Sequence, residues 1–253
     1  MSNIVNVNGV IFGNNSCPII AGPCSVENEK QIITIAEKVK ELGASMLRGG
    51  AYKPRTNPFH FQGLGKEGLE LLKIARKETG LPIVSECVSV NDLYLFEDID
   101  MIQIGSRNMQ NFDLLKEVGK FGKPVLLKRG FCATIYELLC SAAYIQNQGN
   151  NQIVLCERGI RTFNEEFTRN TLDLSIVPIV HQNSDFPIIV DPSHGTGNRS
   201  LIIPMSLAAA ACGADGLMIE VHQKPDESWT DSKQTIDFNQ FNDLVNKLKQ
   251  VRK

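Results

Sequence analysis

The stretch Val125-Leu-Leu-Lys-Arg-Gly130, followed by the segment Thr134–Gln148, holds one copy of the unit that decides the fold of this chain. Val125–Leu127 is a short apolar run that predicts a buried strand, and Thr134–Gln148 has the length and apolar content of a helix. Two cations and a glycine stand between them. A strand, a polar turn and a helix in this order are typical of a parallel sheet with helical crossovers.

This strand-then-helix unit recurs along the whole chain. The predicted strands are Cys17–Ala21, Ser45–Leu47, Pro82–Ser85, Met101–Ile104, Val125–Leu127, Ile153–Leu155, Ile188–Val190 and Gly216–Ile219. The predicted helices are Glu29–Leu42, Glu67–Glu78, Val90–Glu97, Phe112–Lys120, Thr134–Gln148, Ser200–Cys212 and Phe238–Val251, with a looser stretch through Val180 after the sixth strand. Eight such units in 253 residues predict an α/β protein, a (β/α)8 TIM barrel. The alternative is a doubly wound open sheet, but its Gly-x-Gly-x-x-Gly motif does not follow the first strand.

A short alternating segment precedes the first strand. Ile4–Phe12 surrounds Asn8-Gly9, which is a strong signal for a β-hairpin with a type I′ turn. We expect this hairpin, within residues 1–16, to cover the N-terminal end of the barrel. Because no linker divides the chain, residues 1–253 are predicted to form a single domain, and the roughly sixteen residues ahead of the first predicted strand are too few for a regulatory domain.

Composition narrows the class of protein. The net charge of −2 gives no overall attraction to nucleic acid or to a membrane surface, and no apolar run approaches the roughly 20 residues of a membrane span. The seven cysteines are scattered and never form a Cys-x-x-Cys pair, so they predict reduced thiols in a cytoplasmic protein. The expected partners are therefore small molecules.

Cations gather where the predicted strands end, which is where a TIM barrel carries its active site. Pro54 and Pro58 stiffen the loop Arg48–Gly65, and arginine side chains match phosphate oxygens two at a time. The set is large enough to bind two phosphates. It consists of Arg48, Lys53, Arg55, Arg107, Lys128 and Arg158.

A second set at the strand ends offers a thiol, an imidazole and two carboxylates. It consists of Cys24, His194, Glu220 and Asp231. This mixture of soft and hard ligands suits a divalent transition metal. The alternative is that Cys24 is a buried thiol and His194 a hydrogen-bonded loop residue. His222, two residues beyond Glu220, is either a rival ligand or, as we favour, a residue supporting the ligands from behind.

Several motifs resemble those of a known enzyme family. They include Ala21-Gly-Pro-Cys-Ser25, Lys53-Pro-Arg-Thr56, Gln103-Ile-Gly-Ser-Arg-Asn108, Cys156-Glu-Arg-Gly159 and Asp191-Pro-Ser-His194. In order and spacing the chain resembles the 3-deoxy-D-arabino-heptulosonate 7-phosphate (DAHP) synthases, in particular the short subgroup related to the octulosonate-8-phosphate synthases. The resemblance implies a metal-dependent transferase that condenses phosphoenolpyruvate with erythrose 4-phosphate, the first step of the shikimate pathway to aromatic amino acids.

The resemblance also implies roles for single residues. Cys24, His194, Glu220 and Asp231 would hold a divalent ion (Mn, Fe, Co or Zn), while Arg107, Lys128 and Arg158, with Arg48 nearby, would bind phosphoenolpyruvate. Arg55 and Thr56 would bind the phosphate of erythrose 4-phosphate, and Lys53 would lie at the reacting centre with Cys24 and His194. The family implies a homo-oligomer, a tetramer or a dimer.

Three alternatives remain open at this point. The nearest is an octulosonate-8-phosphate synthase that uses arabinose 5-phosphate. The second is an aldolase that forms a Schiff base at Lys128. The third is a non-catalytic barrel that binds phosphosugars.

Overall fold

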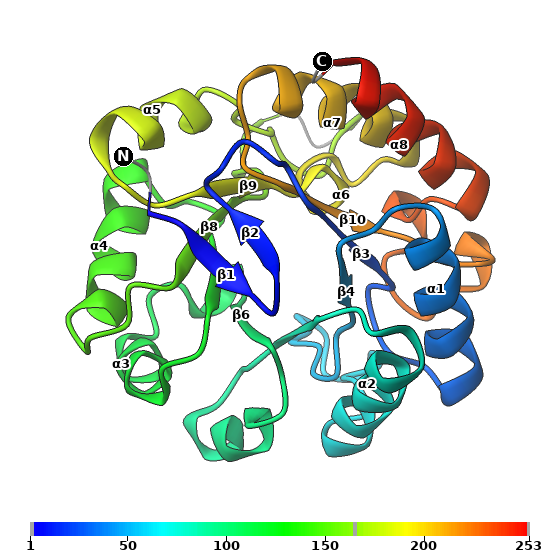
Figure 1. The fold of residues 1–253 in the computed structure, drawn as a ribbon, viewed down its shortest axis with the longest axis horizontal. Helices are drawn as coiled ribbons and strands as arrows, with labels where there is room; N and C mark the ends of the chain where they lie inside the picture. Colours follow the sequence, from blue (N-terminus) through cyan, green and yellow to red (C-terminus); the bar gives the residue numbers. More distant parts are fainter. Residues whose placement is uncertain (1–2, 164–165, 252–253) are drawn as a thin grey trace.

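The computed structural model describes residues 3–163 and 166–251, and its parallel strands close into a barrel (Figure 1). Around the barrel the strand order is β10-β3-β4-β5-β6-β7-β8-β9. The strands are β3 (Ile19–Gly22), β4 (Met46–Arg48), β5 (Ile83–Glu86), β6 (Met101–Ile104), β7 (Val125–Lys128), β8 (Ile153–Glu157), β9 (Ile188–Val190) and β10 (Leu217–Glu220). The predicted TIM barrel is confirmed, and each predicted strand lies within two residues of the observed one.

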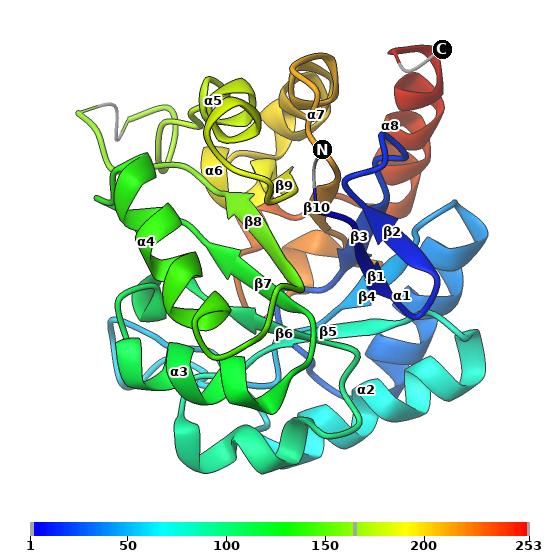
Figure 2. The same ribbon diagram turned by 60° about the vertical axis from the view of Figure 1, so that its left-hand side comes forward.

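Helices cover the outside of the barrel (Figure 2). They are α1 (Glu29–Glu41), α2 (Lys66–Thr79), α3 (Phe112–Phe121), α4 (Ile135–Gln146), α5 (Ile176–Asn183), α6 (Pro192–Thr196), α7 (Ile202–Ala211) and α8 (Phe238–Val251). Short 3₁₀ turns are η1 (Val90–Phe96), η2 (Ser106–Asn108), η3 (Arg199–Leu201), η4 (Pro225–Glu227) and η5 (Ser232–Gln234). Where the predicted and observed helices correspond, their ends agree to within two residues.

Three helical segments differ from the prediction. Val90–Glu97 forms the 3₁₀ helix η1 instead of an α-helix, because its buried Leu93 and Phe96 are three residues apart, the repeat of a 3₁₀ turn. The stretch predicted to be loose contains α5, whose Pro178 lies in the first turn, where proline is tolerated. The short helix α6 was not predicted; Asp191 caps its N-terminus and Pro192 occupies its first position.

Two apolar layers result from the alternation of side chains along each strand. One residue of each strand fills the barrel interior: Ile20, Met46, Val84, Met101, Leu126, Val154, Ile189 and Met218. Their neighbours point outward and pack under the helices, among them Leu47, Ile83, Leu127, Leu155 and Ile219. The interior is therefore a packed core and not a channel.

The predicted hairpin closes the N-terminal end of this core (Figure 1). It consists of β1 (Val5–Val7) and β2 (Val10–Phe12), and both turn residues have positive φ, 47° at Asn8 and 91° at Gly9, as a type I′ turn requires. Val5, Val7 and Phe12 join the apolar cluster of the barrel interior. The hairpin is thus part of the barrel's core.

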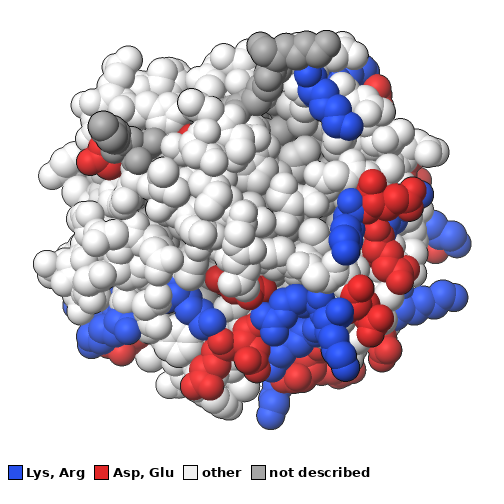
Figure 3. Space-filling view, in the orientation of Figure 1, with Lys and Arg blue, Asp and Glu red and all other residues white. Residues whose placement is uncertain are grey.

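Charged residues are unevenly distributed over the surface seen in Figure 3, where they gather mainly over the side that carries α1 and α2. In the sequence, no Asp, Glu, Lys or Arg occurs between Glu137 and Glu157 or between Arg199 and Asp215, the ranges that contain most of α4 and all of α7.

Among the described residues we find no helix that combines the length and the apolar character needed to cross a membrane.

Phe12 is fully buried in the plug that the hairpin forms. Replacing it by alanine is expected to lower the free energy of unfolding by about 3–5 kcal/mol, because a cavity replaces the packed ring. Chemical denaturation followed by circular dichroism measures this change. Ile4→Ala is the matched control, because Ile4 is 61% exposed in the same hairpin and its replacement should cost less than about 0.5 kcal/mol. Equal effects of the two substitutions would contradict the role of the plug.

Candidate active site at the C-terminal end of the barrel

A charged layer lies directly above the apolar core of the barrel. On six strands, the residue two positions beyond the inward-facing apolar side chain is polar or charged: Arg48, Glu86, Gln103, Lys128, Asp191 and Glu220. On β8 the inward-facing Cys156 comes first, and Arg158 follows two residues later. Of these seven groups all except Glu86 are less than 9% exposed. The barrel's geometry therefore concentrates polar side chains of seven strand ends in one small volume.

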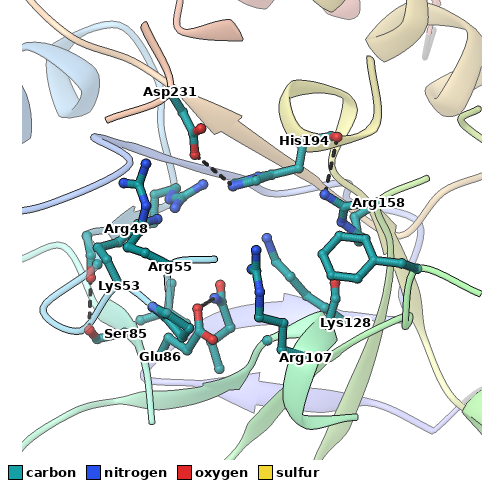
Figure 4. A pocket seen from close by; sticks show the side chains of 18 of the residues that line it. Arg48, Lys53, Arg55, Ser85, Glu86, Arg107, Lys128, Arg158, His194 and Asp231 are labelled. Atoms are coloured by element: carbon teal, nitrogen blue, oxygen red, sulfur yellow. Dashed lines mark hydrogen bonds and ion pairs between the residues drawn. The ribbon is translucent and has the colours of Figure 1, made fainter. Parts of the chain in front are cut away.

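The cavity above this layer contains about 780 Å³ of space outside the protein atoms (Figure 4). Seven cationic side chains line it: Arg48, Lys53, Arg55, Arg107, Lys128, Arg158 and Arg169. Only two carboxylates, Glu86 and Asp231, appear in the same lining. All six predicted cations thus meet in one cavity, while the predicted Thr56 is exposed and outside its lining.

Two arginines of this cavity, Arg107 and Arg158, are poorly neutralised. Burial lowers the pKa of Arg158 to about 10, with Arg169 adding repulsion against the attraction of Asp191. Burial also lowers the pKa of Arg107, and Arg169 and Arg55 lower it further although Glu86 opposes them. Such crowding is relieved when anions bind, so the cavity is built to receive more than one negative charge.

Phe131 gives two of these arginines a common platform. The guanidinium of Arg158 lies 4.7 Å, and that of Arg107 5.3 Å, from the centre of its ring. Contacts of this kind hold a cation by its attraction to the ring face. The aromatic ring thus spaces the two guanidinium groups without neutralising either.

The predicted metal ligands form a compact cluster beside the cavity. One ligand atom from each of Cys24, His194, Glu220 and Asp231 lies within 4.8 Å of the other three. Cys24 Sγ is 3.1 Å from Asp231 Oδ2, and His194 Nε2 is 3.2 Å from Glu220 Oε1. Residues far apart in the sequence therefore converge on one point.

The protonation of His194 makes this point attractive to a cation. Its Nδ1 lies 2.7 Å from Asp191 Oδ2, which fixes the tautomer with the proton on Nδ1 and leaves a lone pair on Nε2. Burial lowers the pKa of His194 in spite of Asp191 and Glu220, which favours the neutral ring. Glu220 Oε1, which faces Nε2, is buried and makes no hydrogen bond, although the Arg48 guanidinium forms an ion pair with it. Two facing lone pairs at this distance fit a bound divalent ion.

Both carboxylates of the cluster are ionised. Burial raises the pKa of Glu220, but His194 when it is protonated, together with Arg48, holds that pKa below its ordinary value. For Asp231 the opposing groups are Lys53 and the protonated form of His194, and the pKa again falls below its ordinary value despite burial. The donor set thus supplies two negative charges, a neutral imidazole and a sulfur, a combination that suits a divalent transition metal.

Lys53 joins the cluster to the cavity. Its Nζ lies 2.9 Å from Cys24 Sγ and 3.3 Å from the Cys24 carbonyl oxygen. Although burial opposes it, Cys24 and Asp231 raise the pKa of Lys53, so the amine stays protonated. Gly50 makes this approach possible, because a Cβ there would lie 2.6 Å from the Cys24 carbonyl oxygen and 2.7 Å from Lys53 Cδ.

The net pKa shift of the Cys24 thiol is opposite to that of the two carboxylates. Burial and Glu220 raise the pKa of Cys24 well above its ordinary value, so the thiol keeps its proton when no metal is bound. A coordinating thiol is deprotonated outright by a metal ion. Metal binding at this cluster should therefore release a proton.

Asp191 connects the cluster to the other wall of the cavity. Besides His194 it accepts a 2.5 Å hydrogen bond from Lys128 Nζ, and all three groups are largely buried. Arg48 makes a similar link, with Nη1 3.1 Å from Glu220 Oε1. Cations expected to bind substrate thus also neutralise the carboxylates around the cluster.

His222 does not join the cluster. Its Nδ1 lies 2.8 Å from the Lys224 carbonyl oxygen, and its Nε2 lies 3.6 Å from Glu27 Oε2. The reading of His222 as a rival ligand is therefore not supported by the geometry. Its contact with Glu27 belongs to the support of the loop that carries Trp229, whose N–H donates to Glu27 Oε1 at 2.9 Å.

Sequence reasoning assigned no role to several residues that complete the site. Glu86 stands at a predicted strand end, and Gly105 leaves room for it, since a Cβ there would lie 2.0 Å from its carboxylate oxygen. Phe131 follows a strand end by three residues, a signal that could have been used. Arg169 and Gln234 come from long loops and carry no comparable signal in the sequence.

Comparisons with known proteins place this geometry in a family. The model of the DAHP synthetase I family matches residues 2–253. A phospho-2-dehydro-3-deoxyheptonate aldolase of Thermotoga maritima is 52% identical over 249 residues, which are 98% of this chain and 73% of that protein. A 2-dehydro-3-deoxyphosphooctonate aldolase of a Geobacter species is 30% identical over 273 residues, covering 99% of this chain and 98% of that protein.

Solved structures agree with the sequence matches. The crystal structure of phospho-2-dehydro-3-deoxyheptonate aldolase (DAHP synthase) from Thermotoga maritima has a TM-score of 0.95 and 51% identity, over 98% of this chain and 73% of that one. A truncated form of 3-deoxy-D-arabino-heptulosonate 7-phosphate synthase from the same organism has a TM-score of 0.91 and 48% identity, over 98% and 91% of the two chains.

Asp191→Asn tests the buried network beneath the cluster. Removing the charge leaves the Lys128 ammonium buried without its partner, which is expected to lower the free energy of unfolding by about 3–5 kcal/mol at neutral pH. Despite burial, His194 and Lys128 hold the pKa of Asp191 well below its ordinary value. The stabilisation is therefore complete above the unfolded pKa of about 3.9 and is lost as pH falls toward the native pKa.

Chemical denaturation of both proteins between neutral and acidic pH measures this difference. The gap between wild type and Asp191→Asn should stay constant above about pH 5 and close below about pH 4. Asp243→Asn is the matched control, because the Asp243–Lys247 pair on α8 is exposed and is worth about 0.3–0.5 kcal/mol. A gap that does not depend on pH would contradict the ionised state assigned to Asp191.

Proposed function

Because this chain belongs to the DAHP synthetase I family, we infer that it condenses phosphoenolpyruvate with erythrose 4-phosphate to give DAHP and inorganic phosphate. It is a DAHP synthase, a transferase of the shikimate pathway. The assignment of this activity to the site at the C-terminal end of the barrel rests on one observation. A cavity lined by seven cations opens directly beside a four-residue cluster that suits a divalent ion.

The wall of the cavity formed by β6, β7 and β8 is proposed to bind phosphoenolpyruvate. Arg107, Lys128 and Arg158 converge there, and Arg48 faces them from β4 (Figure 4). Phosphate and carboxylate groups each present pairs of oxygens, which the planar fork of an arginine binds two at a time. Holding both ends of the molecule fixes its methylene carbon in the cavity, which lowers the entropic cost of the reaction.

The loop after β4 is proposed to bind erythrose 4-phosphate. Arg55 lines the cavity, and the exposed Thr56 lies outside its lining. Arg55 would bind the phosphate, with Thr56 approaching when the sugar is present. Lys53, on the same loop, would then place its ammonium near the aldehyde carbon.

Cys24, His194, Glu220 and Asp231 are proposed to hold a divalent ion (Mn, Fe, Co or Zn). When bound, such an ion supplies Lewis-acid polarisation of the aldehyde oxygen. The chain's own part is to orient these ligands: Asp191 fixes the His194 ring, and Arg48 contacts Glu220. The protein thus determines where the reacting oxygen can lie.

The bond changes follow from the two substrates. The methylene carbon of phosphoenolpyruvate forms a bond to the aldehyde carbon, and water adds to the carbon that carries the phosphate ester. Breaking the bond between this carbon and the ester oxygen then releases inorganic phosphate and leaves a ketone. Of the two protons of the added water, one leaves with the phosphate and the other replaces the proton that is given to the new hydroxyl group. Lys53 is proposed to donate the proton to the new hydroxyl group, because it is held protonated beside Cys24.

The alternatives fit the geometry less well. A Schiff base at Lys128 needs a neutral amine, but a 2.5 Å contact with buried Asp191 favours the ammonium form. A non-catalytic barrel gives no reason for four convergent metal-ligand side chains. Use of arabinose 5-phosphate is the less favoured alternative. The chain is 52% identical to the heptonate aldolase of Thermotoga maritima but only 30% identical to an octonate aldolase.

Assembly and location are also proposals. We propose a homo-oligomer, a tetramer or a dimer, in the cytoplasm. The outer faces of α4 and α7, poor in charge, supply surface for contacts between copies. Residues 1–253 would act as a single catalytic domain.

Metal removal tests the proposed function directly. Phosphate release from phosphoenolpyruvate and erythrose 4-phosphate should stop in EDTA and return when Mn²⁺ or Co²⁺ is added in excess. Cys24→Ala should give no metal-dependent turnover while keeping its circular dichroism spectrum and melting temperature. Cys212→Ala, which removes an exposed thiol at the end of α7, is the control and should behave as wild type. Full turnover of Cys24→Ala in EDTA would sink the metal assignment.

Arg55→Met separates the two substrates. Loss of a charged hydrogen bond of about 1.5–3 kcal/mol should raise KM for erythrose 4-phosphate about 10- to 100-fold. KM for phosphoenolpyruvate should change less than about threefold, because its phosphate is expected at the opposite wall. Steady-state kinetics with each substrate varied, and with arabinose 5-phosphate in parallel, give these values. Lys77→Met on α2 is the control; equal increases in both KM values for Arg55→Met would refute the assignment.

A further inference from the structure

The two carboxylates of the cluster each have one oxygen that points away from it. Glu220 Oε1 faces His194 at 3.2 Å, while Oε2 accepts a 2.6 Å hydrogen bond from Gln234 Nε2. Asp231 Oδ2 faces Cys24 at 3.1 Å, while Oδ1 lies 3.3 Å from Arg169 Nη1. Each carboxylate is therefore held from behind by a separate side chain.

These two supporting side chains are joined to each other. Arg169 Nη1 also donates to Gln234 Oε1 at 3.1 Å. The glutamine amide is thus fixed at both ends, because a reversed amide would place its oxygen against the Glu220 carboxylate and its nitrogen against the guanidinium. A single chain of hydrogen bonds runs from Glu220 through Gln234 and Arg169 to Asp231.

We propose that Gln234 and Arg169 are positioning residues that set the orientation of both carboxylates of the metal cluster. This inference rests on the proposed function, because it takes the cluster to be a metal site. Partners behind metal ligands fix ligand orientation, and their loss typically weakens metal binding about 10- to 100-fold. Here one pair of residues serves two ligands at once.

The surrounding backbone supports this arrangement. Gln234 is 2% exposed, so its amide has little access to water as a substitute partner. Arg169 is anchored by its own N–H, which donates to the Thr196 carbonyl oxygen at 2.8 Å. Gly197 leaves the room that Arg169 needs, since a Cβ at that position would lie 2.4 Å from the Arg169 Cβ.

Gln234 and Arg169 also stabilise the backbone conformation of Asp231. Asp231 has φ 52° and ψ 35°, a left-handed conformation that costs free energy for a residue other than glycine. It persists only where neighbouring contacts fix it. The Gln234 N–H donates to the Asp231 carbonyl oxygen at 3.2 Å, and Arg169 holds its side chain, so both residues stabilise the strained ligand.

Cobalt binding tests the proposal without substrate or turnover. Metal-free protein is titrated with Co²⁺, and the thiolate-to-cobalt charge-transfer band and the d–d bands report affinity and geometry. Gln234→Met keeps the size of the side chain but removes both hydrogen bonds, and Arg169→Met removes the link between them. We expect about 10- to 100-fold weaker binding and altered d–d bands in both variants. Arg169→Lys, which keeps the charge, should recover most of the affinity.

Two further variants complete the design. The double variant should lose less affinity than the product of the two single losses, because both residues act in one network. Gln152→Met is the matched control, since Gln152 is exposed and its Nε2 donates only to the Gly122 carbonyl oxygen at 3.3 Å, at the other end of β8. Its cobalt binding should equal that of wild type.

Each contrary result has a distinct meaning. Affinities of Gln234→Met and Arg169→Met within twofold of wild type, with unchanged d–d bands, would overturn the inference while leaving the metal site in place. Strictly multiplicative losses would contradict a shared network. Failure of the wild-type protein to bind Co²⁺ through Cys24 would overturn the metal site itself. If Gln234→Met does not fold, Arg169→Met still tests the proposal. Arg169 is partly exposed, and its replacement leaves no buried group unpaired except Gln234 Oε1.

Discussion

The alternation of side chains along the strands of a closed barrel is the constraint on which the rest of this structure depends. It sends one residue of each strand into the core and the next toward the helices. Where the apolar core ends, the same alternation leaves the next inward positions to Arg48, Lys128, Asp191 and Glu220. A charged layer buried to this degree is tolerated only because its members pair with one another.

That pairing unites the two halves of the active site. Arg48 contacts Glu220, Lys53 contacts Cys24, and Lys128 reaches His194 through Asp191. Three of the cations that line the cavity are therefore attached to a residue of the metal cluster or to its support. The substrates' charges and the proposed metal ion consequently belong to one electrostatic unit. Binding of the substrates should therefore change the affinity for the metal ion, and binding of the ion should change the affinity for the substrates.

The sequence was sufficient for the barrel, the hairpin and the residues that stand directly at strand ends. Short apolar runs such as Val125–Leu127 and Ile188–Val190 mark strands well, because a strand buried on both faces is a nearly continuous apolar run. Of the residues left without a role by the sequence, Glu86 stands at a strand end, whereas Phe131, Arg169 and Gln234 lie beyond the strand ends. Their part depends on the course of loops, which is set by packing between segments far apart in the chain and not by local pattern. Helix α5 was missed for a related reason, since its proline obscured a helix that tertiary packing stabilises.

The central claim is that a metal ion and two phosphorylated substrates meet at one end of this barrel. A crystal structure of the protein with Mn²⁺ and phosphoenolpyruvate, with the ion located by its anomalous scattering, tests it most directly. The account predicts one ion bound by Cys24, His194, Glu220 and Asp231, at distances on the order of 2.0–2.4 Å, with phosphoenolpyruvate against Arg107, Lys128 and Arg158. An ion bound elsewhere, or phosphoenolpyruvate bound away from these cations, would contradict it.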